Sequence, residues 1–188
     1  MTKKTVFLNG IAVGDVDVGG DRDSEIQAIR TFLEERGLKK EVSRFTANFN
    51  AALAFANTAA HIYEQDLQRA PRKGPSIVPF VVNATFSIEL YIKSLAERYG
   101  TRLTGHKLVQ LHKALPAQAL KAIAAVSLKC ASDRGLKAPD FVMYLERLNN
   151  AFVEWRYFYE KEELGPVEIE PTIFVMQVLH EACRSQDA

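Results

Sequence analysis

The spacing of glycine and proline constrains this chain more than any other feature of its sequence. Between Ser43 and Ala70 neither residue occurs, and Pro71 then ends the stretch. Apolar side chains recur there at intervals of three and four, the period of one helix face; they are Phe45, Phe49, Leu53, Ala56, Ala60, Tyr63 and Leu67. The pattern predicts one long amphipathic helix.

A second long helix is predicted over residues 80–100, where FVVNATFSIELYIKSLAERYG runs up to Gly100. Its apolar content exceeds the single stripe of a surface helix, so we expect it to be the central helix of a bundle. Shorter helices are predicted between the breakers that follow. They cover residues 107–115, 117–134, 138–163 without interruption up to Gly165, and 172–185 after Pro171.

The first residues have a different pattern. Apolar residues flank Asn9-Gly10, the strongest short hairpin signal, and predict a hairpin between about Thr5 and Val18. A short helix should follow, with Asp23 or Ser24 as its N-cap and Gly37 at its C-terminal end. We therefore expect residues 1–40 to form a small appendage and residues 41–188 a helical domain. The predicted fold class is all-α, an up-down helical bundle with a small N-terminal β-hairpin.

Composition limits the classes of protein that the chain can be. Of 188 residues, 47% are hydrophobic, which is ample for a buried core, and 24 basic against 23 acidic residues leave a net charge of +1. No global charge therefore attracts nucleic acid or an anionic membrane. Cys130 and Cys183 lack C-x-x-C spacing, and no signal peptide or spanning apolar run is recognised. We expect a soluble cytoplasmic protein with reduced thiols and no membrane contact.

Sequence motifs for metals and nucleotides are missing. His61, His106, His112 and His180 form no H-E-x-x-H or H-x3-H pattern. The acidic run after Asp15 has Ile26 at the twelfth position, where a calcium loop needs glutamate. Neither glycine-rich phosphate loop occurs. We expect no metal and no cofactor.

Charged residues on two of the long predicted helices suggest a polar cluster. Glu89 and Lys93 lie four apart in the order that favours an ion pair along a helix. That helix is mostly apolar, so further partners are expected, and Arg156 or Glu160 of another helix could supply them. His106 follows Gly105 at a helix start, where its ring could cap backbone donors, pack, or act in catalysis.

Arg156 stands in FVEWRYFYEKEE, a stretch in which aromatic rings and charges alternate. Its guanidinium could stack on a ring or hold a carboxylate or phosphate in its two-pronged fork. We expect it to hold Glu89 or Glu160, with the surrounding rings excluding water from the pair.

Three spaced elements resemble the HEPN superfamily of helical bundles found in bacterial and archaeal toxin–antitoxin and phage-defence systems. They are E-x-x-x-K at Glu89 and Lys93, G-H-x-L-x-x-L at His106, and an aromatic R-Y-x-x-E at Arg156. The resemblance covers roughly residues 43–184. It implies a homodimer and, in the active members, a metal-independent ribonuclease whose R-x4-6-H motif lies at the dimer cleft.

The chain departs from that ribonuclease motif. After Arg147 and after Arg156 no histidine follows at the required spacing, while Arg98 and Arg102 are too far from and too close to His106. The sequence therefore predicts a non-catalytic HEPN-like protein that binds RNA or a protein partner. Its polar cluster, which is either a structural network or a ligand-binding cleft, would contain Glu89, Lys93, His106, Arg156, Tyr157 and Glu160. The rival prediction is a metal-independent ribonuclease in which His106 is the general acid or base and Arg156 stabilises charge.

Overall fold

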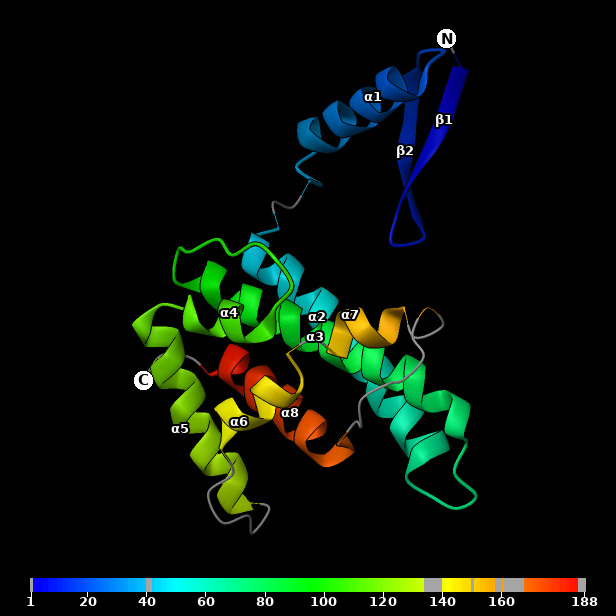
Figure 1. Cartoon of the computed structure of the whole chain (residues 1–188). Helices are drawn as coiled ribbons and strands as arrows, with labels where there is room; N and C mark the ends of the chain where they lie inside the picture. The colour runs from blue at the N-terminus through cyan, green and yellow to red at the C-terminus, as the bar shows by residue number, and fades with distance from the viewer. Residues whose placement is uncertain are drawn as a thin grey trace. The chain divides into compact units, whose positions relative to one another are not determined.

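The computed structural model describes residues 2–39, 42–133, 140–149, 151–157, 160 and 168–185, without the side chains of residues 153 and 156. The chain divides into two compact units, Met1–Val42 and Ser43–Ala188. It is mostly helical, with one small antiparallel sheet of two strands near the N-terminus (Figure 1). The predicted helical fold with an N-terminal hairpin is confirmed at this level.

The first unit consists of the hairpin and one helix. Strand β1, Thr2–Leu8, pairs with β2, Ile11–Val18, so that Leu8 faces Ile11 across a two-residue turn. In that turn Asn9 has φ 53° and Gly10 φ 80°. Positive φ at both positions matches the twist of a hairpin and is tolerated best by Asn-Gly, which is why the sequence signal held.

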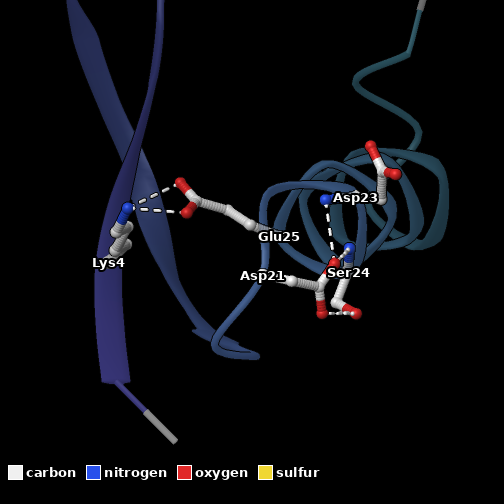
Figure 2. A network of polar contacts seen from close by, with 5 residues as sticks. All are labelled: Lys4, Asp21, Asp23, Ser24 and Glu25. Atoms are coloured by element: carbon white, nitrogen blue, oxygen red, sulfur yellow. Dashed lines mark hydrogen bonds and ion pairs between the residues drawn. The ribbon is translucent and has the colours of Figure 1, made fainter.

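Helix α1, Arg22–Glu35, packs on this hairpin. Val6, Val18 and Phe32 are buried between them, and Lys4 donates to both carboxylate oxygens of Glu25 at 2.7 Å (Figure 2). The core of the unit is small. Its stability depends on these few contacts between sheet and helix.

The predicted N-cap of α1 was wrong. Asp21 caps the helix, because its Oδ1 accepts from the backbone N–H groups of Asp23 at 3.0 Å and Ser24 at 2.9 Å. Figure 2 shows both bonds converging on Asp21, while the carboxylate of Asp23 points away. The acidic run thus ends in an ordinary helix cap, and Gly37 follows the last turn at φ 62° as predicted.

The second unit is the helical bundle. Helix α3 lies at its centre and packs against α2, α4, α7 and α8, as the ribbon also shows (Figure 1). Its helices are α2 Arg44–Ile62, extended by a π-helix Tyr63–Leu67; α3 Ile77–Arg98 after a short 3-10 turn Gly74–Ser76; α4 Leu108–Lys113; α5 Ala117–Asp133; α6 Phe141–Arg147; α7 Ala151–Arg156; and α8 Ile169–Arg184. The expectation that residues 80–100 form a central helix is confirmed.

Helix α3 starts earlier than predicted. Its first residue is Ile77, so Pro79 lies in the first helical turn and not in the preceding linker. A proline is tolerated there because the first N–H groups of a helix have no partner within it. Helix α8 likewise starts at Ile169 and includes Pro171 in its first turn.

The prediction of one uninterrupted helix over residues 138–163 was wrong. Helix α6 ends at Arg147 and α7 begins at Ala151. Asn149, between them, accepts the N–H of Val109 with its side-chain oxygen at 2.9 Å. Asparagine competes well for such backbone bonds, and this one provides a cap for α4 while breaking the late helix.

Burial explains the unusual composition of α3. Among the described residues, Gly74–Arg98 is long and apolar enough to cross a membrane by length and composition alone, which the sequence analysis did not anticipate. Half of its apolar window is buried inside the bundle, and a core helix passes the same test. Cys130 and Cys183 are buried, and neither is in a disulfide bond within the described residues.

Candidate functional site

The candidate site is built on a carboxylate buried in the centre of the bundle. Glu89, on α3, is 1% exposed, and Lys93, one turn later, places its Nζ 2.7 Å from Glu89 Oε1. The predicted ion pair is therefore present. A buried carboxylate without a partner would be costly, so Lys93 compensates a charge that the fold withholds from water.

His106 supplies the second partner of Glu89. Its Nδ1 lies 3.2 Å from each carboxylate oxygen, and the side chain is 63% exposed. It stands in the segment between α3 and α4, directly after Gly105, whose φ of 96° lets the chain turn there at little cost. The exposed imidazole of His106 is thus held in place by the buried carboxylate of Glu89.

This contact fixes the role of each ring nitrogen. Because an ionised carboxylate can only accept, Nδ1 carries the proton between His106 and Glu89. Nε2 then accepts a hydrogen bond in the neutral ring and donates one when the ring is protonated. The outer layer of the cluster, made of Lys93 and His106, is suited to an anionic or hydrogen-bonding group.

A column of aromatic rings lies beside this layer. The ring of Phe152, on α7, is 6.3 Å from the His106 ring and stacks on Phe86 of α3 at 5.0 Å. Phe86 in turn meets Phe55 of α2 edge-on at 4.6 Å. These ring contacts join α2, α3 and α7 and limit the movement of the elements beside His106.

Three of the six predicted cluster residues come together: Glu89, Lys93 and His106. Tyr157, at the end of α7, is 38% exposed, and Glu160 is also exposed, so the structure does not bury either of them with Glu89. The side chain of Arg156 lies outside the described residues, as does the pair it was expected to form.

Of the alternatives left open for His106, the structure shows packing and not the capping of a helix. The N-cap position of α4 is Lys107, which makes no capping bond with its side chain, and Asn149 provides the cap from a distant segment. His106 is thereby left to contact Glu89 and Phe152.

Sequence reasoning missed a second polar cluster, formed where α2, α3 and α8 meet. Tyr91 Oη and His180 Nδ1 are 2.9 Å apart, and the ring of Phe49 stacks on His180 at 5.8 Å. Burial raises the pKa of the Tyr91 phenol and lowers the pKa of His180. The thiol of Cys183, which contacts the Tyr91 carbonyl at 3.6 Å, has its pKa raised to about 12 by burial. These shifts favour the neutral forms and indicate a structural cluster.

We expect the stability of the protein to fall as the pH drops below about 6.5, the ordinary histidine value. The folded-state pKa of His180 is lowered, so below that pH the unfolded chain binds a proton that the folded chain resists. The contribution is complete above pH 6.5 and is lost as the pH falls towards the folded pKa. His180→Asn should show a shallower loss in urea unfolding between pH 7.5 and 5; an unchanged slope would contradict this.

Comparison with known proteins yields no relative. No protein-family model, curated protein or solved structure matches the chain.

Within the described part of the chain, no group of three or more His, Cys, Asp or Glu side chains could hold a metal ion. The functional argument therefore depends on the cluster around Glu89.

Proposed function

We propose that this chain is a non-catalytic HEPN-like binding protein whose Glu89–Lys93–His106 cluster holds a phosphate of single-stranded RNA. The observation that carries the proposal is the His106 ring, largely exposed yet fixed at 3.2 Å from a buried carboxylate. Holding a side chain in place before binding lowers the entropic cost of recognition. Lys93 adds a cation, and the neighbouring ring of Phe152 is the kind of group on which RNA bases stack.

The family proposal has separate support. The E-x-x-x-K pair lies on the central helix, and both the helix that follows His106 and the late aromatic helix α7 pack against it. The same resemblance leads us to propose a cytoplasmic homodimer of a toxin–antitoxin or phage-defence system. Exposed apolar side chains on α5 and α6, Leu128 and Val142, are candidates for the contact between copies. Light scattering would test the dimer.

A second function, metal-independent RNA cleavage, is favoured by one observation. A carboxylate that accepts from Nδ1 leaves Nε2 of His106 on the open side as a base, the arrangement used to orient catalytic histidines. A binding protein leaves the RNA intact and a ribonuclease cleaves it, so one experiment with the same protein separates the two functions.

We expect the purified chain to bind a fluorescent single-stranded RNA and leave it intact in the presence of a chelator. His106→Ala should weaken binding about tenfold or more, because the protonated ring donates one charge-assisted hydrogen bond from Nε2 to the phosphate, and such a bond contributes roughly 1.5 to 3 kcal/mol. His61→Ala, which removes another exposed histidine, is the matched control and should bind as wild type. Anisotropy measures binding and a denaturing gel measures cleavage.

Three other outcomes decide against the first proposal. Cleavage that persists in chelator and disappears in His106→Ala would replace binding by catalysis. Equal loss of binding in His61→Ala would mean that the cluster is not the contact. No binding at low salt, where phosphate contacts are strongest, would overturn both RNA functions.

A further inference from the structure

A cavity of about 540 Å³ opens in the bundle where α2 passes into the π-helix Tyr63–Leu67. Phe80 of α3 and Met176 of α8 are buried at its floor, and the rings of Tyr63 and Phe80 are 6.2 Å apart. Glu89, Lys93 and His106 do not line it. Its volume falls in the range of small-molecule sites, and its apolar floor would hold an apolar group away from water.

The π-helix shapes the wall of this cavity. The N–H of Gln68 donates to the carbonyl of Tyr63 at 2.8 Å, five residues back, which widens the turn. Asp66 anchors it, because its carboxylate accepts from Lys73 at 2.6 Å and from Ser76 at 2.7 Å, and these bonds lower the pKa of Asp66. Single π-turns are frequent at functional sites.

Two opposite charges stand at the rim. Glu64 and Arg69 both line the cavity and both are exposed. Neither makes an ion pair or hydrogen bond with its side chain among the described residues. A ligand with only a negative charge would be repelled by Glu64, and a ligand with only a positive charge would be repelled by Arg69. A zwitterion can place its positive group beside Glu64 and its negative group beside Arg69.

We propose that this cavity binds a free α-amino acid with a large apolar side chain. The carboxylate would take the fork of Arg69, the ammonium would face Glu64, and the side chain would lie among Tyr63, Phe80 and Met176. A longer peptide separates its terminal charges and could not place both on one rim. The proposal is independent of the function assigned to the Glu89 cluster.

The test uses the full chain and L-tryptophan, with tryptamine and indole-3-propionate as analogues that lack one charge each. Calorimetry, supported by ligand-observed NMR, should show tryptophan binding about tenfold or more tighter than either analogue. Glu64→Gln should remove only the preference for tryptophan over indole-3-propionate, which lacks the ammonium. Arg69→Gln should remove only the preference for tryptophan over tryptamine, which lacks the carboxylate.

Two substitutions at exposed positions outside the cavity serve as matched controls. Arg72→Gln removes an exposed arginine outside this cavity, and Glu146→Gln removes an exposed glutamate on α6; both should bind tryptophan as wild type. All four substitutions are at exposed positions and should leave the thermal midpoint unchanged. Absence of binding by tryptophan, phenylalanine and leucine at about 10 mM would overturn the proposal. Equal binding of tryptophan and both analogues would overturn it as well, because recognition would then not depend on the two charges.

Discussion

Lys93→Met is expected to lower the free energy of unfolding by about 2 to 3 kcal/mol, because it leaves Glu89 buried with His106 as its one described partner. Removing one member of a fully buried pair costs roughly 3 to 5 kcal/mol. The loss here should be smaller, since Lys93 is 18% exposed and His106 remains beside the carboxylate. Urea unfolding at pH 7.5 measures it.

Replacing both charges separates the cost of a stranded carboxylate from the value of the pair. Glu89→Leu combined with Lys93→Met fills a similar volume with apolar groups and should be more stable than Lys93→Met alone. The control is Arg147→Met, which removes a cation from an exposed pair with Glu168 and should cost about 0 to 1 kcal/mol. If Lys93→Met lowers the free energy of unfolding no more than Arg147→Met does, Lys93 does not compensate the burial of the Glu89 carboxylate.

The sequence predicted those parts of the site that follow from local spacing. Glu89 and Lys93 meet because residues four apart on a helix are neighbours, whatever the rest of the chain does. The contact of His106 with Glu89 spans seventeen residues and depends on the path of the segment between α3 and α4. The sequence placed both residues in one cluster by resemblance to a family, and it did not predict their direct contact.

In the fold, too, the features set by local sequence were predicted and those set by distant contacts were not. Breakers and periodicity located the hairpin and the central helix, since both are set by short-range geometry. The break between α6 and α7 escaped prediction because its cause, the bond from Val109 to Asn149, joins residues forty apart. The sequence does not show when the cap of a helix start comes from a residue far along the chain.

Arg98 was missed for a similar reason. Arginine entered the sequence argument as a ribonuclease motif or as a partner for a carboxylate, whereas Arg98 binds backbone. Its Nη1 donates to the carbonyl of Ser185 at 2.7 Å and its Nη2 to that of Cys183. These carbonyls belong to the C-terminal end of α8, where the last four have no partner within the helix.

Arg98→Ala should therefore destabilise the bundle by about 3 kcal/mol. Two charge-assisted hydrogen bonds at a helix C-terminus are lost, each worth roughly 1.5 kcal/mol or more. The guanidinium also lies 4.4 Å from the centre of the Phe45 ring, so α2, α3 and α8 are joined through one side chain. Urea unfolding measures the loss, and faster amide exchange in the last turn of α8 would locate it.

The form of the arginine side chain, and not only its charge, should matter. Arg98→Lys keeps a cation near the end of α8 but cannot reproduce a planar fork that donates to two carbonyls, so it should recover only part of the loss. Arg102→Ala, an exposed arginine four residues on, is the matched control and should stay within about 0.5 kcal/mol of wild type. Full recovery by lysine would mean that charge at the helix end suffices. Unfolding of Arg98→Ala at the wild-type midpoint would mean that the end of α8 is held by other contacts.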